Sequence, residues 1–146
     1  MKQAQVFKRK KNLFVLPSSQ TTMGLWVGTD PVVKLEENVS QEEQGEAILH
    51  ALSLSKHGVP HPSDWNIPTN SLLQVAGARS WNEFEGNAKS IVIELDDECL
   101  HIMPSRNLGS GNGFEPLTPN KDIELPAPAT TREIGAALAE ALKRCQ

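Results

Sequence analysis

Hydrophobic and polar positions alternate in short runs along the chain, a pattern typical of β-hairpins. In the first such region, residues 3–9 and 12–16 hold strand-forming side chains, and a polar turn at residues 10–12 joins them. Shorter apolar runs at residues 114–117 and 123–125 predict two further strands. The pattern therefore favours a sheet built from hairpins.

The clearest alternation lies in residues 90–104, where apolar side chains occupy every second position on both halves. A two-residue turn at residues 96–97 predicts a hairpin that pairs Leu95 with Glu98. One face of this hairpin is then aliphatic and packs on the core, with Ile91, Ile93, Leu100 and Ile102. The other face carries polar and reactive groups, namely Glu94, Cys99 and His101, with Glu94 across from Cys99.

Three capping boxes predict where helices begin. Ser40, Ser80 and Thr130 are each followed three positions later by a glutamate, so each side chain can accept from a free amide of the first turn. The first and last of these helices have an apolar stripe at helical spacing. The second is predicted over residues 80–89.

Residues 58–70 contain three prolines, and we expect them to form a long loop. The apolar segment that follows, residues 71–76, fits neither helix nor strand by periodicity. Because hairpins alternate with isolated helices and no strand–helix–strand rhythm is present, the predicted fold class is α+β. We expect a single domain over residues 1–146, with a mainly antiparallel sheet and helices covering one face.

Charge narrows the classes of partner. The 146 residues carry a net charge of −4, and the charge is unevenly distributed. Residues 1–34 hold six cations and one acid, whereas the remainder holds eight cations and 17 acids. An acidic body repels nucleic acid and favours a basic protein partner, because opposite potentials speed encounter. No apolar stretch is long enough to span a membrane and no signal peptide is evident, so a cytoplasmic protein is expected.

Candidate catalytic and ligand-binding groups are few. His57 and His61 have zinc-like spacing, but the intervening glycine and proline disfavour the helix that would align them. The glycine run at residues 109–113 is not followed by a helix, as a phosphate cradle requires. Cys99, His101 and Glu94 form the only Cys/His/Glu grouping, and a small enzyme using that strand face is one alternative. We expect no metal, no cofactor and no enzymatic activity.

Two acidic clusters remain as candidates for binding a partner. They comprise Glu42, Glu43 and Glu46 at the start of a helix, and Asp96, Asp97 and Glu98 at the hairpin turn. Carboxylates can block a nuclease by lying where substrate phosphates would lie, and desolvated charge pairs couple strongly. Trp65, in the predicted loop, is a candidate anchor because tryptophan is enriched among binding hot spots.

The C-terminal half resembles a known family. The resemblance rests on five segments: Ser80-Trp81-x-x-Phe84, Lys89-Ser90-Ile91-Val92-Ile93, Leu100-His101-Ile102-Met103-Pro104, Gly113-Phe114-Glu115-Pro116-Leu117 and Glu133-Ile134-Gly135-x-Ala137-Leu138. These are similar to segments of the immunity proteins of contact-dependent growth inhibition (CDI) systems. The likeness covers roughly residues 80–145, with a looser one over residues 5–55.

The resemblance implies a bacterial cytoplasmic protein that binds and neutralises the C-terminal toxin domain of a neighbouring cell's CDI protein. That toxin is often a nuclease, and here a basic nuclease is expected. The matching segments are structural and carry no active-site residue. The remaining alternative is a general acidic adaptor without a toxin-neutralising role.

Overall fold

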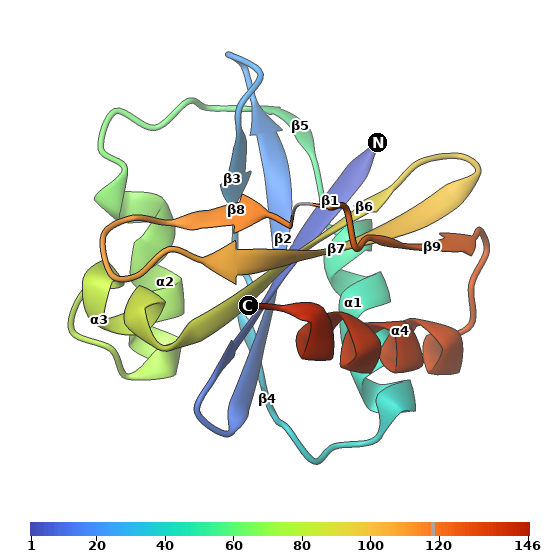
Figure 1. The fold of residues 1–146 in the computed structure, drawn as a ribbon. Coiled ribbons are helices and arrows are strands. Elements are labelled where there is room, and N and C mark those ends of the chain that lie inside the picture. Colours follow the sequence, from blue (N-terminus) through green and yellow to red (C-terminus); the bar gives the residue numbers. More distant parts are fainter. Residues whose placement is uncertain (118) are drawn as a thin grey trace.

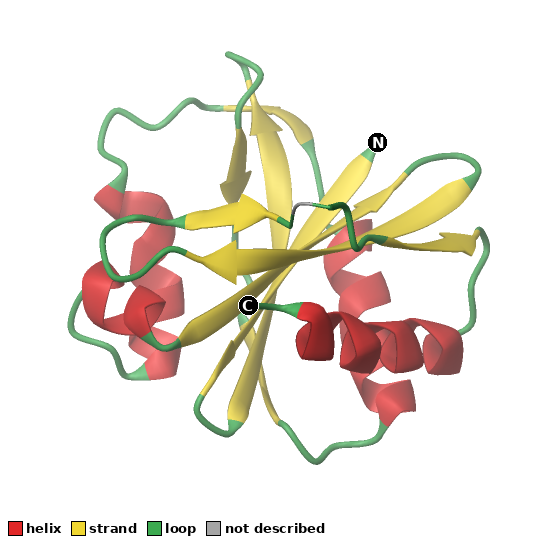
Figure 2. Ribbon diagram, in the orientation of Figure 1, coloured by secondary structure: helices red, strands yellow, loops and turns green. Residues whose placement is uncertain are grey.

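The computed structural model describes residues 1–117 and 119–146. For Ile67 it describes the backbone alone. Within these residues the chain forms nine strands and four helices (Figures 1 and 2). The strands are β1 (Lys2–Arg9), β2 (Asn12–Thr21), β3 (Trp26–Gly28), β4 (Val33–Glu36), β5 (His57–Val59), β6 (Ala88–Leu95), β7 (Cys99–Asn107), β8 (Phe114–Pro116) and β9 (Ile123–Pro126). The helices are α1 (Gln41–Ser53), α2 (Asn66–Ala76), α3 (Trp81–Gly86) and α4 (Thr131–Arg144).

The strands form one sheet in the order β3-β2-β1-β6-β7-β8. The strands β4 and β5 also pair with β2, and β9 pairs with β7. Every pairing is antiparallel except the short one between β2 and β5. The predicted α+β class with a mainly antiparallel sheet is therefore confirmed.

One face of the sheet packs against α1 and α4. Buried aliphatic residues on alternate positions of the central strands face them, including Val6, Val15, Ile93 and Ile102. The two helices approach very closely, since a Cβ built on Gly45 would lie 1.9 Å from the carbonyl oxygen of Thr131. This face holds the larger part of the core.

The opposite face is covered at one end by α2 and α3. Phe7, Phe14 and Leu16 lie on that face and pack with Leu72 and Phe84. Figure 2 shows the two helix pairs on opposite sides of the strands. The expectation that helices cover one face only is wrong, because α2 was not predicted and the second face has its own aromatic cluster.

The predicted register of the second hairpin is also wrong. Leu95 pairs with Leu100, and Ile93 pairs with Ile102, so each residue of β6 lies opposite one two positions later than predicted. The turn is longer because the carboxylate of Asp96 accepts the amides of Glu98 and Cys99, so that pairing with β6 begins only at Leu100. A slip of two residues preserves the alternation of side chains, so the aliphatic face still points to the core.

The predicted long loop is interrupted by a helix. The helix α2 begins at Asn66, and Pro68 lies in its first turn, where a missing N–H costs nothing because that amide has no partner within a helix.

The predicted helix over residues 80–89 is shorter in the structure: α3 ends at Gly86, and β6 begins at Ala88, earlier than predicted. The helix starts at Ser40, Ser80 and Thr130 are confirmed, because each side chain accepts the amide of the glutamate three positions later. Among the described residues, the reciprocal bond of a full capping box is present at Thr130 alone, where the Glu133 carboxylate accepts the Thr130 amide.

The longest helix, α4, has 14 residues. No helix in the described ranges combines the length and the apolar character needed to cross a bilayer.

Candidate functional site

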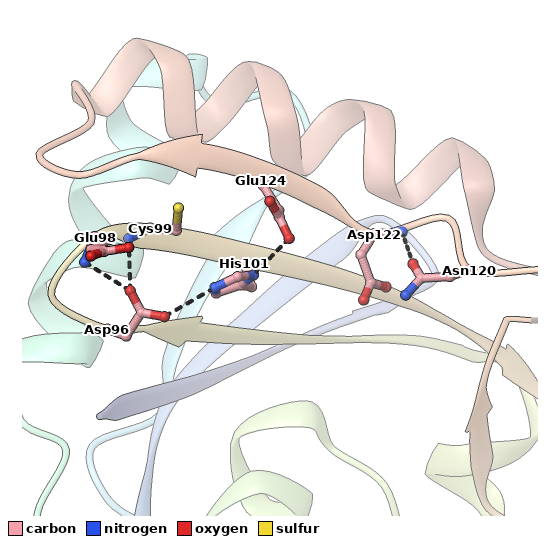
Figure 3. A network of polar contacts seen from close by, with 7 residues as sticks. All are labelled: Asp96, Glu98, Cys99, His101, Asn120, Asp122 and Glu124. Carbon is pink, nitrogen blue, oxygen red and sulfur yellow. Dashed lines mark hydrogen bonds and ion pairs between the residues drawn. The ribbon is translucent and has the colours of Figure 1, made fainter.

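The turn between β6 and β7 carries three consecutive acids. Figure 3 shows how one of them, Asp96, organises the turn. Its Oδ1 accepts the amide of Glu98 at 2.8 Å and that of Cys99 at 2.7 Å. These two hydrogen bonds, followed by a contact with His101, lower the pKa of Asp96 below its ordinary value. Asp96 therefore shapes the turn, while Asp97 and Glu98 are exposed to solvent.

His101 lies between two carboxylates. Its Nε2 is 3.2 Å from Oδ2 of Asp96, and its Nδ1 is 3.4 Å from Oε1 of Glu124 (Figure 3). Strand pairing explains the contact with Glu124, because Glu124 on β9 lies opposite His101 on β7. Asp96 reaches His101 from the turn that precedes β7. Sequence reasoning missed Glu124: residues 123–125 were predicted as a strand, but nothing in the pattern showed which strand they join.

A cavity of about 340 Å³ lies between this turn, α1 and the segment before α4. Its lining comprises Leu49, Leu95, Asp96, Asp97, Leu100, Ala127, Pro128, Ala129 and Ile134. Leu49 is 37% exposed, so part of its side chain faces solvent at this cavity. The cavity thus offers an apolar floor beside the carboxylate of Asp97.

The three acids of α1 precede Leu49 along the helix. Glu46 is one turn before Leu49, and Glu42 is two turns before it, so both follow the same side of α1. Glu43 is exposed nearby at the helix start, where its amide donates to Ser40. Asp97 lines the cavity, Glu98 follows it in the turn, and Glu46 lies one helical turn before Leu49. We refer to these three exposed acids as the acidic edge.

Trp65 lies elsewhere. The turn joins β6 and β7, whereas Trp65 follows β5, which pairs with β2, and β1 lies between β2 and β6. Its indole is 49% exposed and packs edge-on against the imidazole of His61, with ring centroids 5.3 Å apart. The structure therefore brings Asp96 and Asp97 to the same cavity as Leu49, with Glu98 next in the turn, but leaves Trp65 on a separate surface.

The geometry of Cys99 does not favour nucleophilic catalysis. Glu94 lies opposite His101 rather than Cys99, contrary to the prediction. Desolvation raises the pKa of the Cys99 thiol, and the carboxylates of Asp96, Glu124 and Glu98 raise it further. A catalytic thiol needs the opposite effect, since its thiolate is the nucleophile.

The two histidines of the zinc-like spacing act in separate structural contacts. His57 in β5 contacts Gln20 and the carbonyl of Met1. His61 contacts the hydroxyl of Thr21. Within residues 1–117 and 119–146, no group of three or more His, Cys, Asp or Glu side chains is arranged to hold a metal ion.

Solved structures share this fold. A protein of unknown function from Neisseria meningitidis superposes with a TM-score of 0.83 at 23% identity, covering 99% of this chain and 95% of that one. A CdiA-CT/CdiI toxin and immunity complex from Yersinia pseudotuberculosis contains a chain with a TM-score of 0.81 at 19% identity, covering 99% of this chain and 97% of that one. At such identities the likeness shows the fold.

Comparison with curated proteins gives no match. The sequence model of one family, described as CDI immunity protein, matches residues 65–145. This span includes α2 to α4 and the hairpin that carries the acidic turn. It covers more than half of the chain, and the protein therefore belongs to the CDI immunity protein family.

Proposed function

We propose that this protein binds the C-terminal toxin domain of its cognate CDI system in the cytoplasm and neutralises it by binding alone, without catalysing a reaction. Family membership supports the role, and the complex from Yersinia pseudotuberculosis holds a toxin and an immunity protein of this fold together. The observation that carries the proposal is the acidic edge, where the exposed Asp97 lines an open apolar cavity and the exposed Glu98 follows it in the turn.

We propose that the toxin is a basic nuclease that the acidic edge occludes. A nuclease binds phosphates through cationic side chains, and those side chains are attracted to carboxylates presented by a folded surface. Asp97, Glu98 and Glu46 would contact the toxin directly, and Glu42 and Glu43 would extend the contact along α1. Asp96 would position the turn, while Trp65 would contribute from its separate surface.

The proposal is tested with the purified toxin domain and this protein. We expect a stoichiometric complex, loss of nuclease activity at equimolar ratio, and survival of cells that express both proteins. A toxin domain that retains full activity beside saturating immunity protein would contradict the proposal. Binding without loss of activity would instead support an adaptor role.

A further inference from the structure

A second surface of this protein has the features of a binding site, and no part of the proposed acidic contact accounts for it. A cavity of about 520 Å³ opens between β3, the segment that follows β5 and the start of α2. It is lined by Val27, Gly28, Thr29, Asp30, Val59, Pro60, His61, Pro62, Ser63, Asp64, Pro68 and Ser71. This volume is large enough for a long side chain or a small ligand.

The lining combines apolar walls with two carboxylates. Valines and prolines form the walls, and Asp30 and Asp64 supply negative charge without any Lys or Arg among the lining residues. One oxygen of Asp64 accepts the amide of Asn66, at 2.9 Å. Asp30 forms no ion pair with any residue in the part of the chain that the structure describes. Such a cavity suits a cationic group on an apolar stem.

Three large apolar side chains are exposed on the segments around this cavity. Met23 is 72% exposed, Leu25 is 51% exposed and Trp65 is 49% exposed. We call these three residues the tryptophan patch. Exposed apolar side chains that share a surface can mark an interaction site, and contacts through Thr21 and His61 link the two segments that carry these three.

Hydrogen bonds hold the patch in place. The hydroxyl of Thr21 accepts the amides of Met23 and Leu25 and contacts Nδ1 of His61 at 3.0 Å. His61 in turn packs edge-on against Trp65. One buried threonine thus links the β2–β3 turn to the loop that carries the indole. A surface organised before binding loses less entropy when a partner docks.

We infer that this cavity receives a lysine or arginine side chain of the toxin domain, with the tryptophan patch packing around it. The inference rests on the proposed function and adds a second contact region to it. The aliphatic stem would pack on the prolines, and the cationic end would meet Asp30 and Asp64. A guanidinium or ammonium group near Trp65 would also gain from the indole face.

The test compares two variants with a matched control, using an inactivated toxin domain as the probe. D30N/D64N removes both carboxylates of the cavity, and W65A removes the indole. E36Q/E37Q removes the same amount of charge from the last residue of β4 and from the residue after it, which forms a surface ion pair with Lys8. The strand β4 pairs with the opposite end of β2 from β3. We expect the Kd to rise about tenfold or more for each cavity variant and to stay within about twofold for the control. Thermal unfolding confirms that all variants remain folded.

The outcomes separate this inference from the proposed function. If the cavity variants bind like wild type while substitutions in the acidic edge weaken binding, the cavity inference is overturned and the proposed function stands. If the wild-type protein does not bind the toxin domain, both fail. If wild type is a dimer that D30N/D64N converts to a monomer, with toxin affinity unchanged, the cavity serves a second copy of this chain instead.

Discussion

Leu49 of α1 and Asp97 of the hairpin turn line the same cavity. An exposed apolar side chain and an exposed carboxylate therefore share one surface, although they lie on different elements. In protein interfaces, apolar contacts supply much of the affinity, while charges govern the rate of encounter and the choice of partner. The two residues should accordingly affect different kinetic constants.

Charge reversal at the turn should slow association with the toxin domain. In D97K/E98K, we expect the association rate constant to fall about tenfold at low salt and its salt dependence to flatten. Asp96 is left intact because its carboxylate holds the turn together. Stopped-flow binding over a range of salt concentrations measures both effects. The control E36K/E140K makes the same charge change at two other exposed positions, and an equal slowing there would show a general field effect.

Truncation of Leu49 should act mainly on dissociation. In L49A, we expect the complex to dissociate about tenfold faster, because an apolar contact in the cavity is lost, while the association rate changes little. Surface plasmon resonance separates the two constants. Since Leu49 is 37% exposed, the stability of the free protein should change little. An unchanged dissociation rate would place the cavity outside the interface.

Asp96 should make the stability of the protein depend on pH. Its pKa is lowered in the folded state from an ordinary value of 3.8, chiefly by the amides of Cys99 and Glu98. The ionised carboxylate therefore stabilises the fold above pH 3.8, and this contribution is lost as the pH falls through the lowered value. We expect D96N to lower the urea midpoint at about pH 7, and the difference from wild type to shrink as the pH falls below 3.8 towards the lowered pKa.

The control for this experiment is D97N. The carboxylate of Asp97 accepts no hydrogen bond from the described residues. The D97N substitution should therefore leave the urea midpoint unchanged at neutral and at low pH. A difference between D96N and wild type that persists at low pH would show that the effect comes from packing and not from the charge.

Local signals predicted much of this fold, and non-local pairings set the rest. The caps at Ser40, Ser80 and Thr130 could be predicted because each depends on residues three positions apart. That Ile93 and Leu100 point to the core could also be predicted, because an error in register of two residues leaves each side chain on the same face of the sheet. The acids of the turn were correctly grouped because they are adjacent in sequence.

Other features depend on distant segments. Glu124 reaches His101 only because β9 pairs with β7, and α1 reaches the acidic turn only because it packs beside α4. Pro68 was interpreted as part of a loop, although the first turn of a helix accepts proline. The cavity beside Trp65 is built from three separate segments, so no spacing in the sequence could have indicated it.

Glycine at positions 45 and 135 should be required for the packing of α1 on α4. A Cβ on Gly45 would lie 1.9 Å from the carbonyl oxygen of Thr131, and one on Gly135 would lie 2.0 Å from that of Gln41. Alanine normally stabilises a helix relative to glycine by about 1 kcal/mol. Here we expect G45A and G135A each to lower the free energy of unfolding by about 1–3 kcal/mol, because the helices must move apart. Urea denaturation measures this change.

An exposed position on α1 provides the control for the substitutions G45A and G135A. H50A alters α1 without approaching α4, since His50 is exposed, and its stability should stay within about 0.5 kcal/mol of wild type. If G45A were as stable as H50A, the close approach of the two helices would not hold in solution.

Replacing Cys99 should separate an inhibitor from an enzyme. The thiol pKa is raised by desolvation and by neighbouring carboxylates, so little thiolate is present at neutral pH. Binding by the acidic edge does not use the sulfur, and we expect C99S to bind the toxin domain with unchanged affinity and to protect cells fully. H101A provides a second arm, because it removes the only imidazole beside Cys99 on β7. Loss of protection in both variants, with toxin binding intact, would assign a catalytic role to this strand face.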